Sequence, residues 1–476
     1  MFVLALLICI CLFASPVGDC TIRTECSSRQ ENGDGDGDDS SELESPGIRP
    51  VIPGARGFGV EGPIARNRSI LRVTNTKGQG EGSLHAALLS AHENGGGIVV
   101  FETSGVIDVE AAFGNGYLVV EASNLWIAGQ TAPEPGIFVR GGFLMYGRDF
   151  LVQHIGAYRS AKTQRECDTM SLHGTNRGAA PGRAVFDHVA LWGANDGNLD
   201  IARYGGGSVT VQHSIIAAPM LGGHPKAVGH NFNSLIYGSS TGIARITMRN
   251  NLFSTARDRQ PLSSMEELVM VNNVLYNREP LVGRYIYLRN AYQNRNSSKN
   301  SIVGNVFWDT SDEFARLPIL LRPAGAKDGR FMPESRIYLA DNYWNLTDPP
   351  VSDDPWGQLV YHSGIPRDPI LVESAPVWNR GLIALPSGAV LEEVRKNVGP
   401  RPAQRIRFIE QLTAEMGRAP THGFPKSLAD IKGELLGLEE NRRPFEEPTD
   451  PHGLEENGYT HLENLLFDMA REIEGR

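Results

Sequence analysis

The chain has 476 residues, of which 41% are hydrophobic and 21% charged, a composition typical of a globular protein with a large buried core. Its formal net charge of −10 argues against nucleic acid as a partner. The charge is uneven, because residues 245–295 contain eight arginines against four acidic residues. A basic stretch within an acidic chain favours an anionic ligand.

The N-terminal region predicts export. The apolar run MFVLALLICICLFAS is too short to span a bilayer and fits the core of a signal peptide, which we place at residues 1–19; a buried helix is the alternative. Residues 20–56 are acidic and Gly-rich and predict a disordered linker. No later segment is apolar enough to cross a membrane. We therefore expect a secreted or periplasmic monomer, without membrane contact after signal cleavage.

One pattern then recurs over residues 57–385. An apolar run ends in His or Asn, and aliphatic or aromatic residues follow. The anchors recur every 22 to 38 residues, at His154, His188, His213, Asn251, Asn273, Asn305 and Asn342. Repeats of this length indicate a solenoid or a propeller. The variable interval favours a parallel β-helix, in which loops of any length can leave the corners, and the repeated Asn can stack into a ladder.

Helical signals flank the repeats. GSLHAALLSAHENGG, at 82–96, has an apolar face and predicts a helix that caps the open N-terminal end. Helical spacing returns after residue 386. We therefore predict an all-β fold: a right-handed single-stranded parallel β-helix over 57–385, with an N-terminal capping helix and a C-terminal helical and loop extension over 386–476.

The polar residues outside the apolar runs repeat at the same interval. Asp196 follows Asp168 by 28 residues, Lys226 follows Asp196 by 30, and Arg259 follows Lys226 by 33. Such residues can line one face of neighbouring coils, and Asp200 lies on the same side of its strand as Asp196. Clustered carboxylates are suited to a hard cation such as Ca²⁺. The alternative is that these aspartates cap Asp/Gly-rich turns.

His154, His188 and His213 hold equivalent positions in three coils. A stack along the axis of a solenoid is a line, whereas zinc requires ligands that converge. We therefore interpret these histidines as a ladder rather than a zinc site.

Several motifs resemble one family. GSLHAALLSAHENGGGIVVFETSGVID, NLWIAGQTAPEPGIFVRGG, FDHVALWGANDGNLDI, NNLFSTARDRQP and VNNVLYN resemble the secreted pectate lyases of polysaccharide lyase family 1, in the branch with an AGQTAP motif. The likeness covers about residues 65–320. It implies a β-helix that cleaves α-1,4-linked polygalacturonate, an acidic polysaccharide, by Ca²⁺-assisted β-elimination to 4,5-unsaturated oligogalacturonides.

The resemblance also implies roles for single residues. Asp168, Asp196 and Asp200 match the aspartates that ligate calcium in that family. Arg259 begins the Arg-x-Pro motif and matches the catalytic base. Lys226, one coil earlier, is the candidate for a further catalytic residue in contact with substrate.

The chain departs from the family motif at Leu262, where Arg-x-Pro-Arg would place a second cation that binds a substrate carboxylate. Arg257, Arg284 or Arg289 can supply the missing charge, and Arg257 and Arg284 are the candidate substrate-binding residues. Three alternatives stay open: a lyase on another uronate polymer, a glycoside hydrolase on the same scaffold, which needs a pair of spaced carboxylates, and a non-catalytic polyuronate-binding protein.

Overall fold

The computed structural model describes residues 49–476, with gaps. The gaps are 160–165, 174–181, 203–206, 221–229, 239–242, 278–284, 290–295, 311–315, 323–331, 333, 348–353, 363–364, 402–406 and 419–437. The signal peptide and most of the linker expected from the sequence therefore lie outside the described residues.

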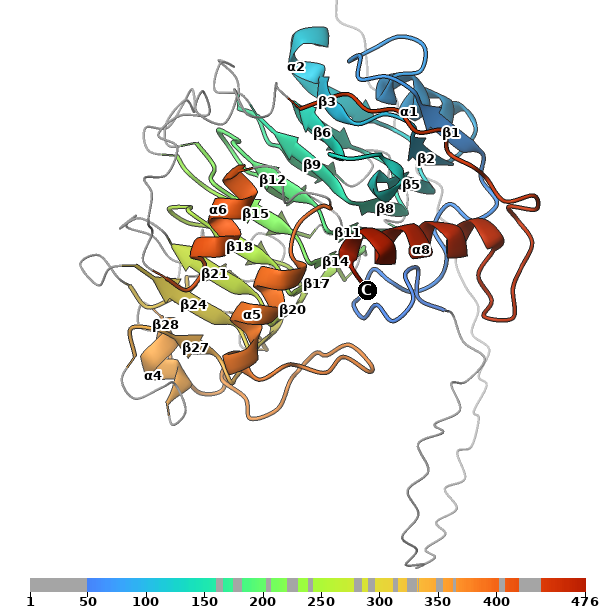
Figure 1. Cartoon of the computed structure of the whole chain (residues 1–476). Helices are drawn as coiled ribbons and strands as arrows, with labels where there is room; N and C mark the ends of the chain where they lie inside the picture. Colours follow the sequence, from blue (N-terminus) through green and yellow to red (C-terminus); the bar gives the residue numbers. More distant parts are fainter. Residues whose placement is uncertain are drawn as a thin grey trace, which may run out of the picture. The chain divides into compact units, whose positions relative to one another are not determined.

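Strands from successive coils stack into three sheets, and every pairing between named strands is parallel (Figure 1). Sheet A contains β1 (Ile70–Val73), β2 (Gly97–Phe101), β5 (Leu125–Ala128), β8 (Phe150–Gln153), β11 (Arg183–Asp187), β14 (Ser208–Gln212), β17 (Arg245–Arg249), β20 (Glu267–Val271), β23 (Lys299–Val303) and β26 (Arg336–Ala340). Sheet B contains β3 (Gly105–Asp108), β6 (Ile137–Arg140), β9 (Ile155–Tyr158), β12 (Ala190–Trp192), β15 (Ile215–Ala217), β18 (Leu252–Ser254), β21 (Val274–Asn277), β24 (Val306–Asp309) and β27 (Tyr343–Trp344). Sheet C contains β4 (Tyr117–Val120), β7 (Gly142–Met145), β10 (Met170–His173), β13 (Leu199–Ala202), β16 (Leu235–Tyr237), β19 (Leu262–Ser264), β22 (Ile286–Leu288), β25 (Ile319–Leu321) and β28 (Val360–Tyr361). The predicted parallel β-helix is confirmed.

An amide ladder runs inside the corner between sheets A and B. The Asn251 side chain donates to Asn273 Oδ1 at 2.9 Å, Asn273 donates to Asn305 Oδ1 at 2.9 Å, and Asn305 donates to Asn342 Oδ1 at 3.1 Å. Each of these oxygens also accepts the backbone N–H of the preceding ladder residue. The predicted Asn ladder is confirmed, and it satisfies polar groups that the buried corner would otherwise leave unpaired.

The histidines form a separate ladder, one residue earlier in each coil. Gln212 pairs with Arg249 in sheet A, so that His213 lies opposite Asn250 rather than Asn251. The assumption that His and Asn anchors are equivalent was therefore wrong by one residue. His213 and Asn250 both have positive φ, at 47° and 53°. Asn tolerates this conformation better than most residues, which explains why the corner is rich in paired Asn.

Helix α1 (Leu84–Glu93) covers the N-terminal end of the coils. Its buried residues are Leu84, Ala87, Leu88 and Ala91, the face predicted from the sequence. Ser83 caps the helix, because its side chain accepts the Ala86 N–H at 3.2 Å. Two short helical segments follow within the coils, α2 (Val109–Ala112) and η1 (Gly129–Thr131).

The C-terminal extension packs on two of the sheets (Figure 1). Its described helices are α5 (Ser387–Asn397), α6 (Arg407–Glu415) and α8 (His461–Glu474), whereas the short α4 (Pro355–Leu359) lies within the coils, just before β28. Helices α5 and α6 share a buried cluster with sheet B, in which the rings of Trp192 and Phe408 lie 5.8 Å apart. Helix α8 shares a cluster with sheet A, in which Trp126 and Phe467 lie 5.6 Å apart.

The domain begins earlier than the sequence suggested. Val51 and Ala55, placed in the disordered linker, are buried in the cluster that joins sheet A and α8. The Val51 N–H donates to Val60 O at 2.6 Å, which fixes this segment as a turn on the β-helix. Among the described residues, no helix has the length and apolarity that crossing a membrane requires.

The ladder gives a prediction about stability. Asn273→Ala removes an amide that bonds to both Asn251 and Asn305 and leaves buried polar groups without partners. We expect the free energy of unfolding to fall by about 2–4 kcal/mol, measured by urea denaturation. Asn464→Ala is the control, because the Asn464 amide bonds to Asn457 in water rather than in the core. Equal losses for both variants would contradict a structural role of the ladder.

Candidate functional site

The three aspartates lie where neighbouring coils enter sheet C. Asp168 precedes β10, Asp196 precedes β13, and Asp200 lies within β13. These strands are paired in parallel, with Ser171 opposite Asp200. All three carboxylates are half-buried, so they are shielded from bulk water but remain open to a ligand.

Gly197 holds two of these carboxylates together. Its N–H donates to Asp168 Oδ1 at 3.0 Å, and a Cβ placed on it would overlap the Asp200 carboxylate. The second oxygen of Asp168 accepts the Ser171 hydroxyl, and Asp200 Oδ1 accepts the Leu235 N–H at 2.9 Å. Only glycine permits this close approach, which explains the Asp-Gly pair in the motif NDGNLD.

The carboxylates raise one another's pKa values. Burial, followed by the charge of Asp196, raises the pKa of Asp168 to about 6. Burial, followed by the charge of Asp168, raises the pKa of Asp200 well above its usual range. A site that disfavours ionised carboxylates in this way gains most from a cation. Three carboxylates supply oxygen donors, which fit a hard divalent ion such as Ca²⁺.

Arg259 lies between β18 and β19, two turns along the stack from Asp196, and its charge interacts with those of Asp200 and Asp196. Its guanidinium lies over the ring of Phe232, 4.1 Å from the ring centre. Burial lowers the pKa of Arg259, whereas the charges of Asp200 and Asp196 act in the opposite direction. The backbone φ of Arg259 is 63°, a conformation that a non-glycine residue adopts only when its surroundings hold it there.

Sequence reasoning missed two aromatic neighbours of the site. His230 Nε2 lies 3.3 Å from Asp196 Oδ1, and the His230 ring packs against Phe232 at 4.1 Å. Single isolated bridges join Gly197 to Phe232 and Phe232 to Asp258, so that the three turns are stacked. The similarity of NDGN at 195–198 to HNFN at 230–233 was the signal that could have revealed this stack.

A second amide ladder lies beneath these turns. Asn198 donates to Asn233 Oδ1 at 2.9 Å, and Asn233 donates to Gln260 Oε1 at 3.3 Å. Each ladder residue lies next to a residue of the candidate site, and Gln260 follows Arg259 directly. The ladder therefore fixes the register of the turns that carry the aspartates and the arginine.

The structure describes only some of the remaining candidate residues. Lys226 and Arg284 lie outside the described residues. Arg257 is exposed, and its N–H donates to Asn231 Oδ1 at 2.7 Å. Leu262 is buried in an apolar cluster with Tyr287 and Leu320 on sheet C.

Among the described residues, Arg289 is the candidate for the positive charge that is missing at Leu262. Its guanidinium lies over the Tyr287 ring, 4.8 Å from the ring centre. Its positive charge is also among the influences that lower the pKa of Arg259, after the dominant effect of burial. The Arg289 Nε has no hydrogen-bond partner in the described part of the chain.

A second group of titratable side chains lies on sheet A. The rings of His154 and His188 stack at 4.7 Å and those of His188 and His213 at 4.8 Å, which confirms the predicted histidine ladder. Ligand atoms of His154, Asp187, His188 and Glu474 lie within 4.8 Å of one another.

Hydrogen bonds explain this second group. His154 Nδ1 accepts the Arg401 N–H at 3.3 Å, so in the neutral ring the proton is on Nε2, which donates to Glu474 Oε1 at 2.9 Å. A metal at Nε2 would displace that proton. The arrangement therefore indicates a hydrogen-bonded network that anchors the C-terminal segments.

Known proteins share both the sequence pattern and the fold. The chain is 29% identical over 260 residues to proteins named probable pectate lyase C from Neosartorya fischeri and Aspergillus terreus; the match covers 54% of this chain and 54% of each relative. The chain thus matches only about half the length of these relatives. No family model matches the sequence.

One solved structure supports the fold directly. Jun a 1, the major allergen of cedar pollen, superposes with a TM-score of 0.51 at 13% identity, over 73% of this chain and 92% of Jun a 1. At this identity the match shows the fold alone, a right-handed parallel β-helix. The resemblance to pectate lyases is confirmed, and the chain is a relative of proteins named probable pectate lyase C with the β-helix predicted from its repeats.

Proposed function

We propose that the protein is a pectate lyase that cleaves α-1,4-linked polygalacturonate by Ca²⁺-assisted β-elimination. One observation carries the proposal: the carboxylates of Asp168 and Asp200 both adjoin Gly197, and Arg259, two turns along the same stack, carries a charge that interacts with Asp200 and Asp196. The names of the curated relatives support the same class of reaction. The proposal includes a secreted or periplasmic location and a monomeric state, and both rest on the sequence.

Asp168, Asp196 and Asp200 would hold Ca²⁺ and leave coordination positions for water and a substrate carboxylate, because calcium takes roughly six to eight oxygen ligands. When bound, the ion supplies positive charge beside the carboxylate of the sugar that reacts. The hydrogen bonds from Ser171 and Gly197 orient Asp168. The Leu235 N–H orients Asp200.

Arg259 is the proposed base. In its neutral form it accepts the C5 proton of the uronate, a double bond forms between C4 and C5, and the bond from C4 to the glycosidic oxygen breaks. The oxygen leaves with the bonding electrons and takes a proton from solvent. Burial favours the neutral form of the guanidinium, and the Phe232 ring holds its plane. The ionised aspartates oppose neutralisation, so that cation binding and base formation are coupled.

The other basic residues have proposed roles in binding. Lys226 remains a catalytic candidate and Arg284 a substrate-binding candidate on the basis of the resemblance. Arg257 is exposed beside Arg259, where it can contact a neighbouring sugar carboxylate. Arg289 is the proposed replacement for the cation that the family motif places at Leu262.

The first test separates the two arginines of the ARDR segment. Arg259→Ala should lower kcat by about 10²–10⁴-fold, because it removes the proton acceptor. Arg257→Ala should mainly raise KM. The measurement is the ultraviolet absorbance of unsaturated products from polygalacturonate. Wild-type rates for Arg259→Ala would refute the assigned base, and polyuronate binding without product in the wild type would indicate a binding protein instead.

The second test uses the pKa shift of Asp168, from an ordinary 3.8 to about 6. Because the metal-free folded state holds this proton more tightly than the unfolded state, its stability falls as pH rises through that window. Ca²⁺ should therefore raise the melting temperature more at about pH 8 than at about pH 5. The Asp200→Asn variant should lose most of this increase. An equal effect of Ca²⁺ at both pH values would contradict the site.

The third test concerns Arg289, which directly follows the strand paired with that of Leu262. Arg289→Gln should raise KM for polygalacturonate by about tenfold with a smaller change in kcat, because it removes a charge that binds the substrate. Leu262→Met is the matched control, since it conserves the apolar volume in the cluster with Tyr287. Steady-state kinetics of both variants decide the question. An unchanged KM for Arg289→Gln would remove Arg289 from the binding site.

A further inference from the structure

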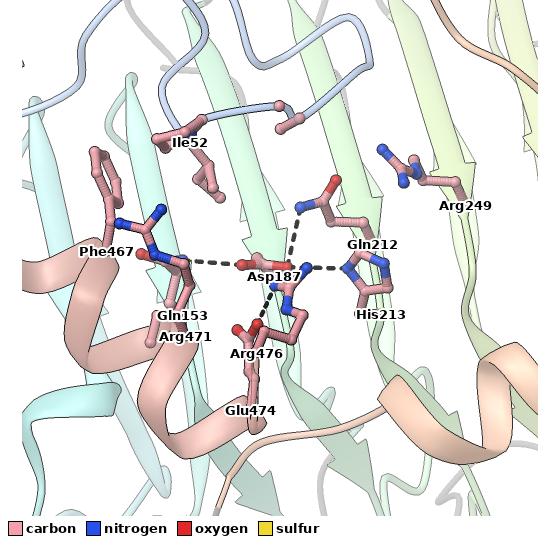
Figure 2. Close-up of a pocket in the computed structure, with 14 residues that line it drawn as sticks. Ile52, Gln153, Asp187, Gln212, His213, Arg249, Phe467, Arg471, Glu474 and Arg476 are labelled. Carbon is pink, nitrogen blue, oxygen red and sulfur yellow. Dashed lines mark hydrogen bonds and ion pairs between the residues drawn. The ribbon is translucent and has the colours of Figure 1, made fainter. Parts of the chain in front are cut away.

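A cavity of about 260 Å³ lies on sheet A, away from the aspartates at sheet C (Figure 2). Its floor is formed by strands β11, β14 and β17, and its walls by the segment Ile52–Ala55 and the last turns of α8. Its position gives it no part in the reaction proposed above. The groups that line it are nevertheless specific and incompletely paired.

Arg249 supplies a cation without a matching carboxylate. Its Nε donates to Asn250 Oδ1 at 3.3 Å, and within the described residues its guanidinium forms no ion pair. Burial is the main influence that lowers the pKa of Arg249; the charge of Asp187, and more weakly that of Glu393, opposes it, whereas the charges of Arg56 and Arg476 add to it. Figure 2 shows the Arg249 side chain extending from β17 toward the cavity.

The acidic groups of the cavity are already occupied. Asp187 accepts from Gln153 at 2.9 Å and from Gln212 at 3.0 Å, and it contacts His188 at 2.9 Å. Glu474 bonds to His154 and to Arg476. Asp187 acts on Arg249 through its charge, but no ion pair joins the two among the described residues, so the Arg249 guanidinium keeps donors for a further anionic group.

Gln212 requires a hydrogen-bond donor, whereas Arg249 requires an anion. Its Nε2 donates to Asp187, but its buried Oε1 has no hydrogen-bond partner in the described part of the chain. A buried acceptor of this kind needs a donor such as a hydroxyl group. The cavity thus offers a cation for an anionic group and an acceptor for a hydroxyl, beside the apolar surfaces of Ile52 and Phe467.

We propose that this cavity binds a small hydroxy acid of single-sugar size, a uronate monosaccharide, with its carboxylate on Arg249 and a hydroxyl group on Gln212. The volume is below the roughly 300–1,000 Å³ usual for larger ligands, which favours one sugar rather than a chain. The choice of a uronate rests on the proposed function, whereas the need for an anion and a hydroxyl rests on the cavity alone. A uronate site on sheet A would be separate from the substrate face on sheet C.

The test is isothermal titration calorimetry of the full chain with D-galacturonate as the probe. Arg249→Gln should weaken binding at least tenfold. Arg245→Gln is the matched control, because it makes the same change on the same strand, four residues earlier, and Arg245 lies beside Glu267 outside the cavity. We expect its affinity to equal that of the wild type. Galactose, which lacks the carboxylate, and acetate, which lacks the hydroxyls, should both bind at least tenfold more weakly than galacturonate.

Equal galacturonate affinity of Arg249→Gln and wild type would overturn the proposal, as would acetate binding as tightly as galacturonate. If Arg249→Gln does not fold, Gln212→Met provides the second variant, and an unchanged affinity would again refute the site. The two proposals fail separately. Lyase activity without binding that depends on Arg249 would refute only the cavity, and such binding without lyase activity would refute only the proposed reaction.

Discussion

The register between neighbouring coils is the constraint on which this structure depends. Side chains alternate between the two faces of a strand, so that a shift of one residue would turn the core-facing side chains outward. Apolar packing alone does not fix such a register. Here the amides of Asn251, Asn273, Asn305 and Asn342 bond both to one another and to the backbone of the preceding coil. One register satisfies all of these bonds at once.

The candidate site uses the same principle at another corner. Asn198, Asn233 and Gln260 form a ladder beneath the turns, and the functional side chains project from the residues next to it. Holding Asp168 and Asp200 over Gly197 costs free energy, because both carboxylates are kept partly from water and near each other. Loops with no ladder would relax and separate these charges. The buried amides therefore maintain an arrangement that the carboxylates by themselves oppose.

The interval of the repeats was enough to predict the coils and the face that carries the aspartates, and the apolar face of residues 82–96 was enough to predict the capping helix. The one-residue offset between His213 and Asn251 was not visible, since both residue types suit a corner with positive φ. The contacts of Arg259 with Phe232 and of α8 with sheet A were also missed. Such contacts join segments whose separation follows no period, so that only the folded chain reveals them.

In two buried groups of carboxylates the pKa values are shifted in opposite directions. Burial alone would raise the pKa of Glu474, but the hydrogen bond from His154 and the proximity of His188 outweigh it and lower the value to about 2. Glu474 thus favours the folded state above its ordinary pKa of 4.5, and this contribution is lost as the pH falls toward 2. For Asp168 burial is again the largest influence, but the charge of Asp196 adds to it, and the pKa rises to about 6. The protein supplies the partners of Glu474 itself, which suits an anchor for α8. The pKa of Asp200 stays raised even though the charge of Arg259 acts to lower it, which suits a binding site for a cation.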